Sequence, residues 1–260
     1  MTPPRPPDLT MVVPTYNEKD RIAELVDALF AATSSNGVEL ELVIVDDNSP
    51  DGTGAVVDEL ARTRRMKVVH RAGKLGLGTA VVAGIGVATA DIVGVMDADF
   101  SHPPALVPRM FAAFRATGAQ ALVASRYIPG GSTPNWPLKR KLLSRFGCLL
   151  ARPISPIRDA ASGFFLIKRS IAESVTIKAG GFKICIELLI RAWPTDLVEI
   201  PYRFDDRELG ESKMSMREAS GYFWQLRDLY KVRWLGPSRP KRRYRQLTLE
   251  EVEKTLQAAR

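Results

Sequence analysis

The chain has 260 residues, of which 45% are hydrophobic and 25% are charged, a composition typical of a globular protein with one large core or two small ones. Its formal net charge of +8 suits a polyanionic partner, which could be nucleic acid, an acidic membrane or a phosphorylated substrate. The longest apolar run, residues 80–88, is far shorter than the ~20 residues that span a bilayer, so no membrane-spanning helix is expected.

In chain order, short β-branched runs alternate with amphipathic stretches. The runs predict strands over residues 9–13, 40–47, 67–70, 91–99 and 120–125. The stretches between them predict helices over residues 18–32, 54–65 and 78–88 and after Pro103. This alternation predicts an α/β fold with a Rossmann-like, doubly wound and mainly parallel sheet that carries helices on both faces.

Beyond residue 127 the pattern loosens. It predicts helices over 138–145, 183–192 and 216–234, and strands over 164–168 and 197–204. We predict one domain over residues 1–235, with a first half at about 9–127 and a second half at about 128–235. Residues 236–260 are predicted to be a basic C-terminal tail: GPSRPKRRYR suggests a linker, and a capping box at Thr248 and Glu251 predicts one exposed helix.

Polar motifs follow four of the predicted strands at their carboxyl ends. They are PTYNE from residue 14, DDNSPDGT from residue 46, DAD from residue 97 and SRY from residue 125. In doubly wound sheets, ligands bind beyond the carboxyl ends of the strands. The sequence therefore predicts one binding site along this edge of the sheet.

Asp97 and Asp99 leave a strand with one residue between them, so both carboxylates can point the same way and bind one cation. Two carboxylates this close repel each other unless a metal or a proton resolves the charge. Oxygen ligands of this kind favour Mg²⁺ or Mn²⁺. An isolated DxD more often merely ends a strand, but its coincidence with three other motifs favours a metal site.

The residues after the first two strands suit a nucleotide. Tyr16, beside the rigid Pro14, can stack on a base, and Glu18 can accept hydrogen bonds from sugar hydroxyls. Asp47 can accept hydrogen bonds from a base or a ribose. Turn formation and helix capping are the structural alternatives for both motifs, and they explain Asp51 in part.

Basic side chains recur on the later loops. Arg126 lies in SRY, and Arg207 and Lys213 lie in DRELGESK. Arg140 and Ser144 are spaced i, i+4 and share one helix face, where both could hold an oxyanion. A solvated surface charge is the alternative for each basic residue.

Two further features carry structural predictions. The glycine string GKLGLGTAVVAG lacks the Walker pattern and the full dinucleotide-binding pattern, so it is interpreted as a tight helix entry. His102, after DADFS, has no partner at the spacing of a triad or a zinc site. A supporting or structural role is therefore favoured for His102 over the role of a base.

Five motifs occur in order: PTYNE, VDDNSPDGTG, MDADFSHPP, SRYIPGG with NWPLKRKLLSR, and DRELGESKMS. Together they closely resemble the dolichyl- or polyprenyl-phosphate mannosyltransferases of glycosyltransferase family 2, over about residues 11–233. PTYNE and DxD indicate only the broad family, whereas SRY with DRxxGESK is typical of the polyprenyl-phosphate branch. The resemblance implies a GT-A fold, with a nucleotide-sugar half at about 9–127 and an acceptor half at about 128–235.

The resemblance also implies roles for individual residues. Donor contacts are implied for Pro14, Tyr16, Glu18, Val45, Asp47, Asp97, Ala98, Asp99, Arg126, Arg207 and Lys213. Of these, the residues implied in catalysis are Asp99, Arg126, Arg207 and Lys213. The acceptor phosphate is expected at Arg126, Arg140 and Ser144, and the metal at Asp97, Asp99 and Ser101. Ser101 stands where some relatives carry Gln, and Phe165 stands where many carry a basic residue.

The expected reaction is an inverting, metal-dependent transfer of mannose from GDP-mannose to a polyprenyl (dolichyl-type) phosphate. The acceptor phosphate is already ionised at neutral pH, because its second pKa is about 6, so no strong general base is needed. A family 2 transferase using another sugar nucleotide, such as UDP-glucose, is the alternative. A basic nucleic-acid-binding protein is disfavoured, because the acidic clusters would repel phosphate.

The expected location is the cytoplasm, peripherally at the cytoplasmic face of a membrane or through a small membrane-anchoring partner. Residues 1–8 lack the apolar stretch of a signal peptide, and Cys148 and Cys185 are expected to be reduced core thiols. The aromatic and basic residues of 221–236 suit an interfacial helix, although packing against the sheet explains the aromatics equally well.

Overall fold

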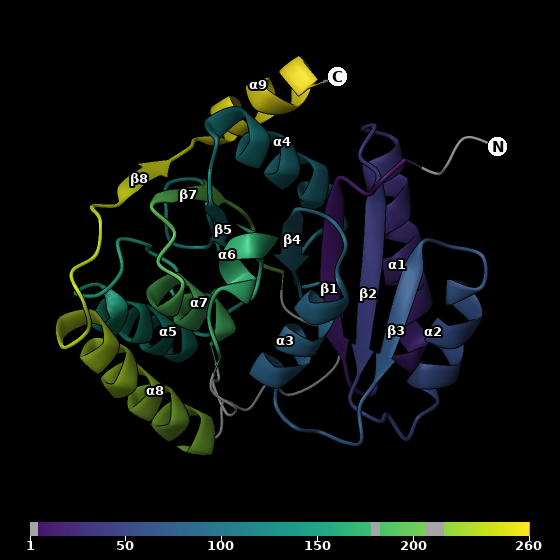
Figure 1. Ribbon diagram of the computed structural model, residues 1–260, viewed down its shortest axis with the longest axis horizontal. Coiled ribbons are helices and arrows are strands. Elements are labelled where there is room, and N and C mark those ends of the chain that lie inside the picture. Colours follow the sequence, from purple (N-terminus) through teal and green to yellow (C-terminus); the bar gives the residue numbers. More distant parts are fainter. Residues whose placement is uncertain (1–4, 178–182, 206–215, 260) are drawn as a thin grey trace.

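The computed structural model describes residues 5–177, 183–205 and 216–259. These residues form an eight-stranded sheet with the order β3-β2-β1-β4-β6-β5-β7-β8 (Figure 1). The strands are β1 (Leu9–Thr15), β2 (Leu40–Asp46), β3 (Met66–His70), β4 (Ile92–Val95), β5 (Ala121–Ser125), β6 (Phe165–Lys168), β7 (Asp196–Pro201) and β8 (Arg243–Gln246).

The sheet is mainly parallel, as predicted. β6 alone among these strands runs antiparallel, between β4 and β5. Phe165 of β6 lies opposite Val95 of β4 on one side and opposite Val123 of β5 on the other. The first residues of β6 therefore lie at the same edge of the sheet as the carboxyl ends of β4 and β5.

Helices cover both faces of the sheet, again as predicted. Alternate residues of β1 point to opposite faces: Met11 and Val13 belong to one buried cluster, and Val12 belongs to the other. The first face is covered by α1 (Lys19–Ser34), α2 (Thr53–Ala61), the short helix η1 (Pro104–Leu106), α4 (Val107–Thr117) and α9 (Leu249–Ala259). The second face is covered by α3 (Leu77–Val87), α6 (Arg169–Glu173) and α7 (Ile184–Arg191).

Two more helices extend the fold beyond the sheet. α5 (Leu138–Ala151) and α8 (Met216–Trp234) pack with α7 around a third cluster, which includes Ile186, Ile190, Leu226 and Leu229. The Tyr222 hydroxyl donates to the Gly147 carbonyl at 3.0 Å, so α5 and α8 lie side by side. None of the helices in the described part of the chain combines the length and the apolar character that a bilayer crossing needs.

The segment after residue 236 differs from the predicted linker and exposed helix. Residues 243–246 form the edge strand β8, paired in parallel with β7. α9 packs on α4 with Val252 and Leu256 buried, and the Arg109 Nε donates to Glu253 at 2.9 Å. The predicted capping box is present, since the Thr248 N–H donates to Glu251 at 2.7 Å. This segment is therefore integrated into the same sheet and core as the preceding chain.

Candidate active site

The four polar motifs meet at one edge of the sheet. β1, β2, β4 and β5 run in the same direction, so their carboxyl ends lie together. Pro14 and Thr15 of β1 pair with Val45 and Asp46 of β2. Val45 is fully buried, so its side chain is not accessible to a ligand.

The loops after β1 and β2 form one hydrogen-bonded unit. The Asn17 N–H donates to Ser49 Oγ at 3.0 Å, and Ser49 Oγ donates to Asp46 Oδ1 at 2.5 Å. The Glu18 N–H donates to Thr53 Oγ1 at 3.0 Å. Asn17 and Asn48 both adopt positive φ, near 60° and 58°, a conformation that asparagine tolerates. Asp46 thus serves the turn chemistry that the sequence left as an alternative.

Asp47 follows β2 and is nearly buried. Its carboxylate accepts a hydrogen bond from Arg71 Nη1 at 2.6 Å, and Arg71 also donates to Thr79 Oγ1 at 2.5 Å at the start of α3. Burial raises the pKa of Asp47, and Arg71 offsets only part of that rise. The sequence analysis missed Arg71, although it follows directly on β3 and so falls at the same edge. Gly76, with φ of 99°, provides the predicted tight entry to α3.

Tyr16 is one of the exposed aromatic residues at this edge. The Lys74 ammonium lies 4.3 Å from the centre of its ring, on the loop that leads into α3. This cation–π contact places a positive charge beside Tyr16 at the carboxyl edge of the sheet. Lys74, like Arg71, comes from a loop to which the sequence analysis assigned only a structural role.

Asp97 and Asp99 follow β4. Asp99 is nearly buried and accepts hydrogen bonds from the Ser101 N–H at 3.0 Å and from Ser101 Oγ at 2.5 Å. Phe100, between Asp99 and Ser101, has a positive φ of 61°. This conformation is strained for a bulky residue and is typical of functional loops. Ser101, predicted as a metal ligand, is placed in this structure as a hydrogen-bond donor that orients Asp99.

His102 lies behind Asp97 and is fully buried, stacked on Phe164 with ring centres 4.9 Å apart. Its Nδ1 accepts the Asp97 N–H at 3.0 Å, and its Nε2 lies 3.8 Å from Asp97 Oδ2. Burial lowers the pKa of His102, so the ring is neutral at pH 7 and its proton is assigned to Nε2. This geometry suits the predicted supporting role.

Gly163, just before β6, borders the same carboxylate. A Cβ atom at this position would lie 3.4 Å from both carboxylate oxygens of Asp97 and 3.3 Å from His102 Cε1. The absence of a side chain therefore keeps the space in front of Asp97 open. The sequence analysis missed Gly163, because nothing local marks a glycine whose neighbours come from a distant strand.

Arg126 follows β5 and is almost fully enclosed. Its Nε and Nη2 donate to the two carboxylate oxygens of Asp159 at 2.7 Å, and Phe204 and Trp136 flank the guanidinium. Burial lowers the pKa of Arg126, but the charge and hydrogen bonds of Asp159 outweigh burial and raise it. Arg126 thus faces the site with its orientation fixed by Asp159, which the sequence analysis missed.

A second buried carboxylate holds Asp159 in place. Glu199 of β7 accepts the main-chain N–H groups of Arg158 and Asp159 at 2.9 Å, and the Tyr244 hydroxyl of β8 donates to Glu199. Burial raises the pKa of Glu199, and these donors offset that rise in part. The network therefore links the C-terminal strand to Arg126 through two carboxylates.

Lys183, the residue before α7, is a basic group that the sequence analysis did not single out. Gln225 of α8 holds its main chain, accepting from the N–H at 3.1 Å and donating to the carbonyl at 3.1 Å. Burial and the charge of Arg126 lower the pKa of Lys183, while Asp97 and Asp159 act in the opposite direction. Its ammonium therefore lies within electrostatic reach of both carboxylates.

The predicted acceptor residues lie on the other side of Arg126. Ser144 Oγ accepts a hydrogen bond from the Tyr127 hydroxyl at 2.7 Å, and the Arg140 guanidinium lies 4.0 Å from the Trp136 ring centre. α5 thus places Ser144 against Tyr127 of SRY and Arg140 against Trp136, which flanks Arg126. Arg207 and Lys213 lie outside the described residues.

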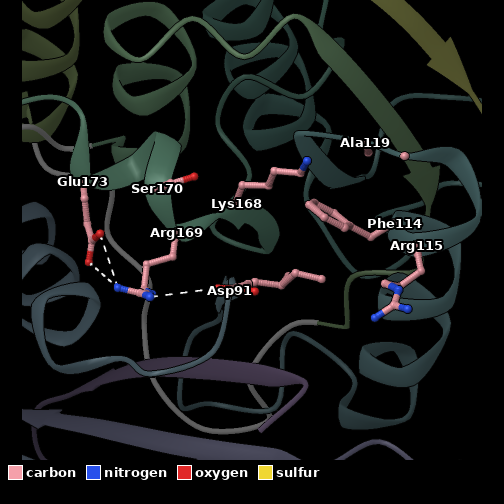
Figure 2. A pocket seen from close by; sticks show the side chains of 10 residues that line it. Asp91, Phe114, Arg115, Ala119, Lys168, Arg169, Ser170 and Glu173 are labelled. Atoms are coloured by element: carbon pink, nitrogen blue, oxygen red, sulfur yellow. Dashed lines mark hydrogen bonds and ion pairs between the residues drawn. The ribbon is translucent and has the colours of Figure 1, made fainter. Parts of the chain in front are cut away.

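A pocket of about 530 Å³ lies at the opposite edge of the sheet (Figure 2). Arg169 pairs there with Glu173 at 3.1 Å and lies 4.0 Å from Asp91, which precedes β4. The pocket is separated from the four motifs by the length of the strands. The candidate active site is therefore the edge that carries Asp97 and Asp99.

The residues at this edge suit a hard divalent cation. Carboxylate oxygens from Asp97 and Asp99 are the ligands that Mg²⁺ and Mn²⁺ prefer, and Asp97 is partly open to solvent. Within the described residues, no third acidic, histidine or cysteine side chain completes a protein-only site. A cation held by two carboxylates keeps positions for phosphate oxygens of a substrate.

The protein has the GT-A fold of glycosyltransferases, in which a mainly parallel α/β sheet carries this acidic pair at its carboxyl edge. The loops after β1 and β2 lie at the same edge. The chain belongs to glycosyltransferase family 2: the family described as "Glycosyl transferase family 2" matches residues 10–184. The predicted family, fold and enzyme class are thereby confirmed.

Relatives of known name match over most of this chain. The dolichol-phosphate mannosyltransferase of Saccharomyces cerevisiae is 36% identical over 234 residues, which cover 86% of this chain and 87% of the relative. The polyprenol monophosphomannose synthase of Mycolicibacterium smegmatis is 39% identical, with 83% and 85% covered. The dolichol-phosphate mannosyltransferase of Pyrococcus furiosus is 36% identical over 88% of this chain, which spans only 64% of that protein's length.

Solved structures share the fold at lower identity. The glucosyl-3-phosphoglycerate synthase of Mycobacterium tuberculosis, crystallised with Mn²⁺, UDP and glucosyl-3-phosphoglycerate, gives a TM-score of 0.60 at 20% identity over 89% of this chain and 81% of that chain. The mannosyl-3-phosphoglycerate synthase of Rubrobacter xylanophilus gives 0.62 at 17% identity over 91% and 77%. The former has also been crystallised with Mg²⁺ and UDP.

Proposed function

We propose that this glycosyltransferase moves mannose from GDP-mannose to the phosphate of a polyprenyl or dolichyl phosphate, with inversion at the anomeric carbon. The observation that carries the proposal is the meeting, at one sheet edge, of the acidic pair with the SRY segment and the α5 face that holds Arg140 and Ser144. The names of the relatives, all polyprenyl-phosphate mannose enzymes, support the choice of donor sugar and acceptor.

On the donor side, the β1 and β2 loops receive the nucleotide. Asp47 offers a carboxylate to the base or ribose, and Tyr16 offers an exposed ring for stacking. Glu18 lies beside them, since its N–H is fixed by Thr53. Arg71 and Lys74 supply positive charge on the neighbouring loop, which suits a diphosphate.

Asp97 and Asp99 are proposed to hold Mg²⁺ or Mn²⁺, which would supply positive charge to the departing diphosphate. Ser101 orients the Asp99 carboxylate, and His102 holds the main chain of Asp97. Ser101 as a direct ligand stays a proposal. Arg207 and Lys213 are proposed to contact the same diphosphate on sequence grounds alone.

On the acceptor side, Arg126, Arg140 and Ser144 are proposed to bind the lipid phosphate. Asp159 fixes the Arg126 guanidinium before any ligand arrives, and such preorganisation lowers the cost of binding an anion. The phosphate oxygen that attacks is already ionised at neutral pH. The buried and neutral His102 need not act as a base.

A donor screen tests this function. The protein would be incubated with polyprenyl phosphate, Mg²⁺ or Mn²⁺, and either GDP-mannose or UDP-glucose, and product lipid would be measured. Transfer from GDP-mannose is expected, and Asp99→Ala is expected to lower it by at least about a hundredfold. Asp91→Ala, at the opposite end of β4, is the matched control and keeps wild-type activity.

Turnover of UDP-glucose without turnover of GDP-mannose would establish the alternative donor. Activity of Asp99→Ala equal to that of the control would remove the acidic pair from the reaction. The same assay decides both outcomes, and the two variants each remove one carboxylate near an end of β4.

We further propose that the enzyme meets its lipid substrate by docking peripherally on a membrane, directly or through a small anchoring partner. An apolar surface on α5 and α8 supports this. Four residues of α5 lie along one helix face and are exposed, as are two aromatic residues of α8. This α5–α8 surface comprises Leu138, Leu142, Phe146, Leu149, Phe223 and Trp224.

Exposed cations border the α5–α8 surface, among them Lys139, Arg145, Arg227 and Lys231. Apolar side chains framed by Lys and Arg are typical of helices that lie in a membrane interface and are attracted to anionic lipid. The neighbouring Tyr222 and Tyr230 instead bond to α5 carbonyls and hold the two helices together. Of the aromatic side chains of α8, Tyr222 and Tyr230 therefore pack against α5, whereas Phe223 and Trp224 are exposed.

Sedimentation with vesicles of phosphatidylglycerol and phosphatidylcholine tests docking. The double variant Leu142→Gln/Phe146→Gln is expected to lose most of the vesicle-bound fraction. Leu249→Gln, an equally exposed leucine at the start of α9, is the matched control and is expected to bind as the wild type does. Equal binding by the double variant and the control would place docking on another surface or on a partner.

A further inference from the structure

Three arginine side chains gather around one indole ring at the carboxyl end of α7. The guanidinium carbons of Arg233, Arg239 and Arg242 lie 5.1, 4.9 and 3.6 Å from the centre of the Trp193 ring. Trp193 itself has a positive φ of 53°, and its Nε1–H donates to the Pro240 carbonyl at 3.0 Å. The fold therefore holds Trp193 in a strained conformation at the centre of these three cations, which we call the arginine cluster.

The helix end balances only part of this charge. Arg239 donates to the Ile190 and Arg191 carbonyls, and Arg242 donates to the Leu189 carbonyl, all in the last turn of α7. A helix carboxyl end carries roughly half a negative charge. Among the ion pairs recorded within residues 5–177, 183–205 and 216–259, none involves a member of the arginine cluster. Most of the three positive charges are thus without an acidic partner in this part of the chain.

The unfavourable effects of burial and of like charges are clearest at Arg242. Its Nε and Nη1 are buried and donate to no partner among the described groups. Burial, together with the charges of Arg239 and Arg233, lowers the pKa of Arg242 to about 9, so it is still charged at neutral pH. Buried donors without acceptors and like charges at close range both destabilise a fold. A bound anion would relieve the like-charge repulsion, which the helix end relieves only partly.

The surroundings indicate the kind of anion. Trp234 and Leu235, next to Arg233, are 61% and 82% exposed. Lys231 and Lys241 are exposed nearby in the sequence. Planar guanidinium groups match phosphate oxygens in pairs, and exposed apolar side chains beside them suit a phosphate that is attached to a lipid.

We infer that Arg233, Arg239 and Arg242 form a phosphate-binding site, which takes either the phosphate of an anionic phospholipid headgroup or inorganic phosphate. It lies at the opposite end of α7 from Lys183, a helix of eight residues and so ~12 Å long. The site is therefore distinct from the transfer site. The lipid source would extend the proposed membrane docking, whereas phosphate binding does not depend on it.

Inorganic phosphate is the first probe. The thermal midpoint of the wild type would be measured against phosphate concentration, with chloride at matched ionic strength as the reference, because a ligand of the folded state raises the midpoint. Arg233→Gln is the chosen variant, since its recorded contact is with a ring and its loss spares the helix end. We expect it to weaken phosphate binding about tenfold, as for one charge-assisted contact.

Arg115→Gln is the matched control, because Arg115 is an exposed arginine of α4 whose recorded contact is also with a ring, 5.9 Å from the centre of Phe111. It lies outside both the arginine cluster and the α5–α8 surface. It is expected to change phosphate affinity less than about twofold. If Arg233→Gln fails to fold, Arg233→Lys retains the charge without the planar fork and is expected to weaken binding to a smaller degree. Equal stabilisation of the wild type by phosphate and by chloride would overturn the inference.

Vesicles separate the two sources. With phosphatidylglycerol vesicles, a several-fold smaller bound fraction for Arg233→Gln than for Arg115→Gln assigns the site to a lipid headgroup. An equal bound fraction, with phosphate affinity still lost, assigns it to free phosphate. None of these measurements uses sugar transfer, so their failure and the failure of the proposed reaction are independent.

Discussion

Arg126 and Asp159 form a buried, two-pronged ion pair across 33 positions of sequence, with both nitrogen–oxygen distances at 2.7 Å. The same carboxylate accepts the Arg126 main-chain N–H at 3.0 Å. One side chain thus fixes both the backbone and the head group of the arginine that faces the candidate site. Breaking a buried pair by removing one charge is costly, because the other charge is left without a partner.

Asp159→Asn is therefore expected to lower the free energy of unfolding by about 3–5 kcal/mol. Urea unfolding followed by circular dichroism measures this. Glu173→Gln breaks the more exposed pair with Arg169 and is the control, with an expected loss of about 1 kcal/mol or less. Similar losses in the two variants would mean that the buried pair is not a stabilising feature.

Gly163→Ala tests the space before Asp97. The new methyl group would press on His102 and on both Asp97 carboxylate oxygens at 3.3–3.4 Å, which is tighter than ordinary contact. We expect the Mg²⁺ concentration for half-maximal transfer to rise roughly tenfold, as when an outer-shell partner of a metal site is disturbed. The unfolding free energy should change by less than about 1 kcal/mol.

Gly86→Ala in α3 is the control for this substitution, since no atom lies within 4 Å of the added methyl. It is expected to leave the metal dependence unchanged and to stabilise the helix by up to about 1 kcal/mol. An unchanged metal dependence in Gly163→Ala would mean that the Asp97 carboxylate is not a ligand of the activating metal.

Glu199→Gln probes the buried carboxylate under Asp159. Burial raises the folded-state pKa of Glu199 above its unfolded value of 4.5. Because the folded state then holds the proton more tightly, the wild type gains stability below pH 4.5 and loses it as pH rises through the folded pKa. The gap in unfolding free energy between wild type and Glu199→Gln is expected to narrow as pH rises from 4.5.

Chemical denaturation of both proteins at a series of pH values measures that gap. A gap that widens with pH would show that the donors around Glu199, including Tyr244, outweigh burial and hold the carboxylate ionised. The comparison of two proteins at each pH cancels the titration of groups that they share.

Leu256→Ala tests whether the C-terminal segment is a tail. Leu256 of α9 is buried in the structure, so its truncation is expected to cost about 2–4 kcal/mol of unfolding free energy. Leu249→Ala, exposed at the start of the same helix, should change stability by no more than about 0.5 kcal/mol. An unchanged free energy of unfolding in Leu256→Ala would mean that this segment does not stabilise the core, as expected of a tail.

The sequence predicts which residues lie at the carboxyl edge of the sheet, but it does not predict the buried carboxylates that hold Arg126 in place. Tyr16 and Asp47 follow a strand directly, and Asp97 and Asp99 lie in the loop just after β4. Parallel strands bring their ends to one edge whatever the details of packing. Asp159 and Glu199 act on Arg126 from positions 33 and 73 residues away, and no local pattern announces such a pairing. A charged residue in the apolar run LVEIP was the one available signal for Glu199.

The C-terminal strand illustrates a different limit. KRRYR has the composition of a linker, yet charged side chains are also what edge strands use to avoid pairing with other molecules. Arg243 and Arg245 point to solvent while Tyr244 between them packs inward, a period of two that five residues can barely display. Pairing with β7 makes this segment a strand. That pairing depends on residues outside the segment, so the sequence of the segment alone does not predict it.

β6 acts as a spacer that sets the width of the active site. It lies between β4, which ends before Asp97, and β5, which ends before Arg126, so these two groups stand two strand spacings apart, or ~10 Å. Because β6 is antiparallel, its first residues, which Gly163 precedes, lie between the ends of β4 and β5. The reversal of one four-residue strand thus separates the carboxylates that follow β4 from the guanidinium that follows β5.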